Sequence, residues 1–433
     1  MYTFGGSVLL LAGCRDRGEN VLNADDYNRF TQEFVARRNG ALKSGEEAAW
    51  LKGVDPSNQA LVKHEKMFFA NLRKVGFEQL EFVTEPYPLV PEPQRYTKSL
   101  THEHPIAYKV SMRSKLSFDR VASEADYTYI FGLVGDTWTL LDFGPDTEDA
   151  DTRYDAPWDL NALKVVKAGD VLLAADSSVK DFEKYAKVAA RASREVRALW
   201  GKHAALPGFA VFLTQSQKNY GSWYGKHDPS RTEGMEMTLR EKGNIEQYAG
   251  ARVIINLANS LKGGDPFSAL KHEMTHAIGV MLQKPTIALP GAGGALEMNT
   301  GVPTWAVEGF ATYFENRGVP RKVANEAALV GDGIRKGLLR GDLPRNKGFY
   351  DGDEIYFNYA VGWSIFDFLA RAKGHETAVA VYVDLLTHPA FDNMQGADAL
   401  FDSLYRLKLQ SEPFVDTRNS KFWAAWKAHV SRF

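Results

Sequence analysis

Two histidines four residues apart, in the stretch from His272 to His276 (His-Glu-Met-Thr-His), constrain this chain more than any other feature. Residues i and i+4 of an α-helix project from the same face, one turn apart, so both imidazoles can bind one metal ion. Glu273, beside the first histidine, is then placed to act as a general base. This pattern predicts a zinc site on a helix. The alternative is a pair of surface histidines beside a charged residue.

The residues around this stretch also favour a helix. Asp265 can cap its N-terminus, and Pro266 suits the first helical position. Pro285 ends the helix after Gln283, because the residue before a proline is pushed out of the helical conformation.

The third metal ligand decides the class of site. In metzincins, the second histidine is followed by a glycine at +3 and a histidine at +6. Gly279 fills the first position, but the second is Leu282, which cannot bind metal. A three-histidine site of that type is therefore excluded.

A downstream segment, Trp305 to Glu315, resembles the W-x-x-E-G-x-A-x-Y-x-E signature of gluzincin peptidases of the peptidase MA-like group. The resemblance implies that Glu308 is the third ligand of a Zn²⁺ ion, giving a His₂Glu set with an open position for water. Glu308 follows His276 by 32 positions, a longer link than in the related aminopeptidases. The intervening run from Lys284 to Thr304 is rich in Gly, Pro and Ala and is interpreted as an inserted loop.

The same resemblance implies two further features of the site. Thermolysin carries an Asp four residues after its ligand glutamate, but Thr312 stands there, so the group that orients His272 is left open. In aminopeptidase-like gluzincins a later tyrosine donates to the oxyanion, and Tyr359, with Gly362 at +3 and Gly374 at +15, matches its surroundings. The alternative for Tyr359 is a packing role in an apolar helix.

The N-terminus carries a short apolar run, Ser7 to Cys14, that ends in the chain's single cysteine. Leu-Ala-Gly-Cys resembles a bacterial lipobox, which implies a protein anchored by lipid on Cys14 at the extracytoplasmic face of the cell membrane. The residues before the run contain no Lys or Arg, unlike a typical signal peptide. The alternative is a hydrophobic tail with an incidental thiol. A single cysteine also excludes an internal disulfide framework.

The chain divides at an acidic stretch that is poor in apolar residues. Five Asp and Glu residues and two prolines lie between Gly144 and Pro157, a composition typical of a linker. Before it, predicted helices precede strands with a turn at Gly135-Asp136, an order that resembles the cone-shaped nuclear transport factor 2-like fold. We therefore predict a signal and tether over 1–23, a cone-like α+β domain over 24–143, a linker over 144–157 and a gluzincin peptidase domain over 158–433.

The last of these regions is predicted to hold a small sheet, the metal helix and a helical lobe, so the whole chain belongs to the α+β class. Besides the helix that carries His272 and the helical segment from Trp305 to Glu315, the predicted elements are helices 24–50, 58–72, 179–200, 355–373, 378–386, 397–409 and 421–430, and strands 77–85, 107–118, 126–133, 137–143, 162–168, 171–175, 209–213 and 251–258.

The composition is that of an ordinary globular protein. The net charge is −2, and no Lys/Arg-rich run indicates nucleic-acid binding. The sequence thus predicts zinc-dependent peptide-bond hydrolysis, with His272, His276 and Glu308 as ligands and a peptide or protein as substrate. Two alternatives stay open: a lipid-anchored binding protein whose zinc is structural or absent, and a protein whose cone-like domain is the ligand-binding part. The sequence does not indicate an oligomeric state.

Overall fold

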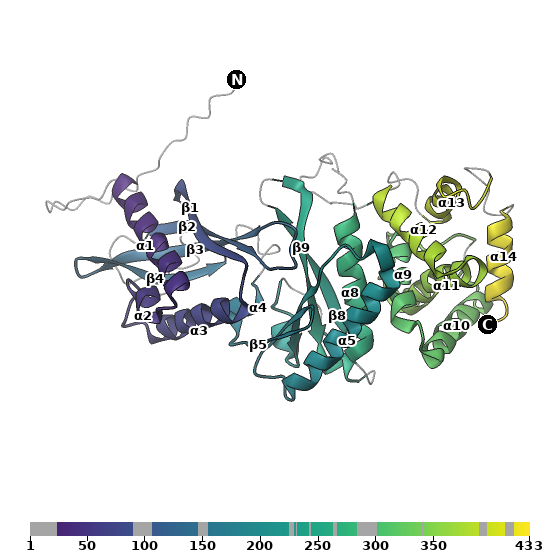
Figure 1. Ribbon diagram of the computed structural model, residues 1–433, viewed down its shortest axis with the longest axis horizontal. Helices are drawn as coiled ribbons and strands as arrows, with labels where there is room; N and C mark the ends of the chain where they lie inside the picture. The colour runs from purple at the N-terminus through teal and green to yellow at the C-terminus, as the bar shows by residue number, and fades with distance from the viewer. Residues whose placement is uncertain are drawn as a thin grey trace, which may run out of the picture.

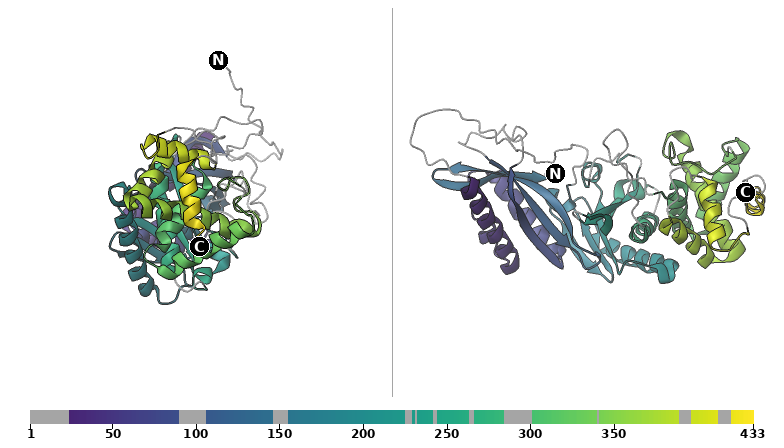
Figure 2. Two further views of the ribbon diagram at one scale, coloured as in Figure 1. Left: turned by 90° about the vertical axis from the view of Figure 1, so that its right-hand side faces the viewer. Right: turned by 90° about the horizontal axis from the view of Figure 1, so that it is seen from above.

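The computed structural model describes residues 24–89, 106–145, 155–224, 229–230, 232–241, 244–262, 266–283, 301–339, 341–388, 396–411 and 420–433. Two sheets and many helices make up these residues, so the predicted α+β class is confirmed. An N-terminal part, a central sheet and a helical lobe follow one another along the long axis (Figures 1 and 2). The predicted lipobox with Cys14, most of the linker, the cap at Asp265 and most of the inserted loop lie outside the described residues.

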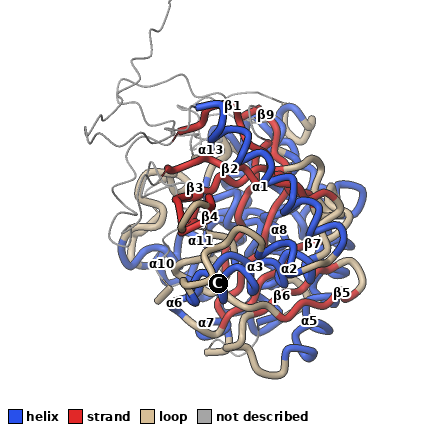
Figure 3. The backbone as a smooth tube through the Cα atoms, turned by 90° about the vertical axis from the view of Figure 1, so that its left-hand side faces the viewer, coloured by secondary structure: helices blue, strands red, loops and turns tan. Residues whose placement is uncertain are grey.

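The N-terminal part consists of three helices followed by an antiparallel sheet with strand order β1-β2-β3-β4 (Figure 3). The single helix predicted over 24–50 is instead two helices, because Gly45 adopts a left-handed conformation with φ of 80°. Strands β3 and β4 form the hairpin predicted at Gly135-Asp136. The elements are α1 (Ala24–Ser44), α2 (Glu47–Leu51), α3 (Gln59–Val75), β1 (Gln79–Leu89), β2 (Ile106–Lys115), β3 (Ser123–Val134) and β4 (Thr137–Pro145).

A buried ion pair lies between these helices and their sheet. Arg38 and Glu65 are both fully buried and approach to 2.8 Å. The guanidinium of Arg38 lies over the ring of Trp50 and donates to the hydroxyl of Tyr129. The indole nitrogen of Trp50 donates to Glu65 at 2.7 Å. Packed aromatic rings and paired charges therefore fill the space between these helices and the sheet.

The central sheet has the strand order β5-β6-β7-β9-β8. Strands β6, β7 and β9 are parallel, whereas β5 and β8 are antiparallel edge strands. The sequence prediction lacks β8, and it places the start of the next strand too late, at Ala251. The elements are α4 (Pro157–Leu160), β5 (Lys164–Ala168), β6 (Val171–Ala175), α5 (Phe182–Trp200), β7 (Phe209–Thr214), α6 (Gln217–Tyr220), β8 (Gly234–Glu241), β9 (Asn244–Asn256) and α7 (Leu257–Ser260).

Both faces of the central sheet are covered. Alternate residues of its inner strands, such as Leu173 and Val211, pack against α5 and the helix α8 (Pro266–Leu282). The residues between them, such as Phe212 and Ile254, belong to the core of the N-terminal part. The N-terminal part therefore forms the second covering layer of the sheet that supports α8.

The remaining chain is helical. Predicted helices over 355–373 and 421–430 are confirmed, whereas α10 is absent from the sequence prediction. No helix within the described ranges is both long and apolar enough to cross a membrane. The helices are α9 (Thr304–Asn316), α10 (Pro320–Arg335), α11 (Ile355–Lys373), α12 (His375–Thr387), α13 (Ala397–Arg406) and α14 (Lys421–Val430).

A second buried ion pair joins the N-terminal part to the central sheet. Arg252, on β9, donates to both carboxylate oxygens of Asp119, at 2.5 and 2.7 Å, and neither side chain is appreciably exposed. Asp119 also accepts from the backbone amide of Leu116. Its neighbour Arg120 donates to the carbonyl of Met281 in the last turn of α8. The same loop therefore contacts both the sheet and α8, the helix that carries His272 and His276.

This pair gives the first prediction. Asp119→Asn should lower the free energy of unfolding by roughly 3–5 kcal/mol, because Arg252 would stay buried without a counter-charge. The double variant Asp119→Leu/Arg252→Met should recover much of that loss. Denaturant unfolding followed by circular dichroism measures both. A loss below about 1 kcal/mol in the single variant would contradict this role for the pair.

Candidate metal centre

Helix α8 brings both histidines to one point. The rings of His272 and His276 lie one turn apart with centroids 4.7 Å apart, and both residues are largely buried. The helix is mostly apolar and packs against the central sheet on one side and against α9 on the other (Figure 1). The two imidazoles consequently face α9 rather than solvent.

Helix α9 supplies the third candidate ligand, Glu308. Its Oε2 atom lies 3.3 Å from Nε2 of His272 and 3.4 Å from Nε2 of His276. The possible ligand atoms of the three residues all lie within 4.8 Å of one another. A tetrahedral zinc with arms of about 2.0–2.1 Å has ligand–ligand edges of about 3.3–3.4 Å. The donor types and the two distances from Glu308 to the histidines therefore fit zinc.

Two glycines allow α9 to pack closely against α11. A Cβ atom on Gly309 would lie 2.2–2.4 Å from backbone atoms of Gly362, and one on Gly362 would lie 2.2 Å from the carbonyl oxygen of Trp305. Any side chain at either position would force the helices apart. Since Gly309 follows Glu308 directly, this contact also fixes the position of Glu308 relative to α11.

The carboxylate of Glu315 contacts the second ring nitrogen of His272, Nδ1, and so orients the imidazole. Its Oε2 lies 3.3 Å from Nδ1 of His272, and its Oε1 accepts from Lys322 of α10 at 2.6 Å. A proton on Nδ1 that is donated to Glu315 leaves Nε2 as the ring nitrogen that could bind a metal ion. Glu315 lies on the same face of α9 as Thr312, one turn further on, so it takes the orienting role that the sequence leaves open.

The charges of these groups depend on each other. Burial raises the pKa of Glu308, but the two histidines outweigh it and hold that pKa well below its usual range. Burial likewise opposes ionisation of Glu315, whose pKa is nevertheless lowered to about 2 by His272 and Lys322. Both carboxylates are therefore ionised at neutral pH, the form in which they bind a cation or accept hydrogen bonds.

The candidate base, Glu273, lies between α8 and the edge strand β8. It is 8% exposed, and burial raises its pKa, against the opposing charges of the two histidines. A Cβ on Gly234 of β8 would lie 2.8 Å from Cγ of Glu273. The absence of a side chain at Gly234 thus leaves room for the carboxylate beside the strand.

Tyr359 also lies beside the cluster. Its ring is nearly parallel to that of His272, with the centroids 6.2 Å apart. Burial and then the charge of Glu308 raise the pKa of Tyr359 well above its usual range, so its hydroxyl stays a proton donor at neutral pH. Two other tyrosines of these helices have different surroundings: Tyr356 is 69% exposed, and Tyr313 contacts His375 and Arg317.

The sequence prediction lacks three contributors to the site. Glu315 is the last residue of the gluzincin-like signature but has no predicted role, and Tyr350, which contacts Glu308, belongs to no motif. Strand β8 does carry a sequence signal, since apolar Met235, Met237 and Leu239 alternate with polar residues.

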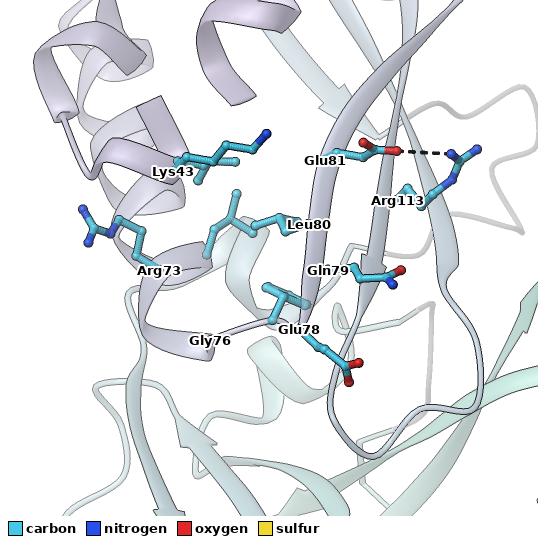
Figure 4. A pocket seen from close by; sticks show the side chains of 11 residues that line it. Lys43, Arg73, Gly76, Glu78, Gln79, Leu80, Glu81 and Arg113 are labelled. Carbon is cyan, nitrogen blue, oxygen red and sulfur yellow. Dashed lines mark hydrogen bonds and ion pairs between the residues drawn. The ribbon is translucent and has the colours of Figure 1, made fainter. Parts of the chain in front are cut away.

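A separate hollow of about 690 Å³ lies in the N-terminal part, between α1, α3 and β1 (Figure 4). Lys43 and Arg73 line the helical side, and Glu78 and the Glu81–Arg113 ion pair line the strand side. Charges of both signs at an open surface select no particular ligand. The helices that line it, α1 and α3, lie at the opposite end of the N-terminal part from α8 and α9 (Figure 1).

Comparison of the chain with known protein families and with curated proteins finds no match. The functional interpretation therefore depends on the site's own geometry and on the sequence signature.

Proposed function

We propose that this protein is a zinc-dependent peptidase whose metal is held by His272, His276 and Glu308. One observation carries the proposal: three donors of the types that zinc prefers converge, with Oε2 of Glu308 3.3 and 3.4 Å from the two Nε2 atoms and no fourth ligand in the described cluster. A structural zinc site is closed by four protein ligands, whereas a catalytic site keeps one position for water. This difference favours catalysis over a purely structural metal.

In the proposed hydrolysis, the metal and the side chains of the protein have different roles. When bound, zinc supplies a Lewis acid that lowers the pKa of water towards about 7 and polarises a carbonyl group. Glu273 accepts the proton of the attacking water and returns it to the leaving amine. Tyr359 donates a hydrogen bond to the oxygen that gains negative charge as the carbonyl carbon becomes tetrahedral.

The edge strand β8 supports a peptide as the substrate. Among the described strands it pairs only with β9, which makes it an edge strand of the described sheet, the kind of strand that extended backbone can join. Gly234 of this strand lies against Glu273, which brings that edge next to the base. A peptide added along β8 would therefore present its backbone carbonyls beside the metal centre.

A non-catalytic binding protein is the alternative, and Glu273 argues against it. Burying a carboxylate that binds no metal costs free energy, and a structural site has no use for it. The packed Arg38–Glu65 interior likewise gives no support to ligand binding within the N-terminal part. Attachment to a membrane through Cys14 stays a sequence prediction, which the intact mass of the exported protein would check.

The second prediction separates the base from the ligands. Glu273→Gln should keep zinc but lose about 10²–10⁴-fold in peptidase activity, because the amide preserves the shape and cannot accept the proton. Glu308→Ala should instead lose the metal. Zinc content and peptide turnover of the two purified variants are the measurements. If both keep zinc and full activity, the assigned roles are wrong.

The third prediction concerns Tyr359. Tyr359→Phe removes the hydroxyl and keeps the ring, so the fold should not change; because the hydroxyl also interacts with Glu308, activity is compared at saturating zinc. If the hydroxyl bonds only to the transition state, kcat should fall about 10²–10³-fold while KM stays similar. Steady-state kinetics on a peptide substrate measures both constants. Turnover at the wild-type rate would mean that Tyr359 has only a packing role.

A further inference from the structure

The two carboxylate oxygens of Glu308 have different neighbours. Oε2 faces the Nε2 atoms of His272 and His276, at 3.3 and 3.4 Å. Oε1 accepts a hydrogen bond of 2.6 Å from the hydroxyl of Tyr350. One oxygen is thus directed at the metal position and the other is occupied by a tyrosine.

The backbone that carries Tyr350 is held in place by side chains of the neighbouring segments. Asn346 accepts from the backbone amide of Thr304, at the start of α9, and Asn358 of α11 donates to the carbonyl of Phe349. Phe349 itself is buried, and its ring packs against those of Tyr350 and Tyr359. The hydroxyl of Tyr350 is therefore delivered from a segment fixed to both helices that flank the site.

We propose that Tyr350 is a positioning residue that makes Glu308 a one-oxygen ligand. The inference depends on the proposed metal site. A carboxylate with both oxygens free can bind a metal through both, which would fill the position that water needs. A strong hydrogen bond from a tyrosine to Oε1 holds that oxygen away from the metal and keeps the fourth position open.

The two tyrosines at this site consequently have separable roles. Tyr350 bonds to the ligand itself, so its loss acts on the metal. Tyr359 stacks beside His272 and also interacts with Glu308, and in the proposed mechanism its hydroxyl acts on the substrate oxygen. Tyr350 is also 53% exposed, so replacing it with phenylalanine removes no buried packing.

The test measures the metal rather than turnover alone. Tyr350→Phe should weaken zinc binding about 10–100-fold in a competition titration against a chromophoric chelator. This is the usual effect of losing a hydrogen bond to a residue that binds the metal. With Co²⁺ in place of zinc, the visible bands of the variant should weaken, because five-coordinate Co²⁺ absorbs less strongly than tetrahedral Co²⁺. Tyr405→Phe, which changes an exposed tyrosine on α13, is the matched control and should behave as wild type.

The outcomes distinguish this inference from the proposed function. Unchanged zinc affinity and an unchanged Co²⁺ spectrum in Tyr350→Phe would overturn the positioning role, even if the wild type hydrolyses peptides. A wild type that binds zinc but cleaves no peptide would contradict the proposed function, while weaker zinc binding by Tyr350→Phe would still support the positioning role of Tyr350. A wild type that binds no zinc would contradict both.

Discussion

The contact between α9 and α11 at Gly309 and Gly362 is the constraint on which the site depends. Backbone meets backbone there, and even one methyl group would force the helices apart. Glu308 precedes the first glycine, and Tyr359 stands one turn before the second, so a single crossing sets the position of both relative to α8. The glycines of the two sequence motifs therefore have a packing reason that is independent of any chemistry.

Ion pairs stabilise the acidic and histidine side chains that the helices bring together. Three carboxylates and two histidines share a nearly buried space, and each buried ion needs a partner, because an unpaired one costs several kcal/mol. Glu308 faces the two histidines, and Glu315 is shared between His272 and Lys322. Of the three carboxylates, Glu273 is the one whose pKa is raised, mainly because it is buried, which is consistent with a carboxylate that exchanges protons rather than one that holds a metal.

Much of the fold can be predicted from periodicity, and the failures have physical causes. Helices with long apolar stripes, such as Ile355–Lys373, are predicted with their observed limits. The edge strand β8 escapes prediction although its residues alternate, because its apolar positions are mainly methionines, which carry little strand preference. Sequence also cannot reveal that the N-terminal part covers one face of the central sheet, since that contact joins residues such as Asp119 and Arg252 that lie far apart in the chain.

The residues of the site are also only partly predictable from the sequence. The helical spacing of His272 and His276 is written in the sequence, and Glu308 follows from a signature. Glu315 and Tyr350 cannot be assigned from sequence, because their roles depend on how α9 meets α8 and on how a loop returns to the site.

Zinc content tests the central claim most directly. Metal-free protein should take up about one zinc per chain after dialysis against zinc and removal of the excess, measured by mass spectrometry of the metal. His272→Ala, treated in the same way, should retain far less. Wild type that takes up well under one zinc, and no more than His272→Ala, would contradict the account.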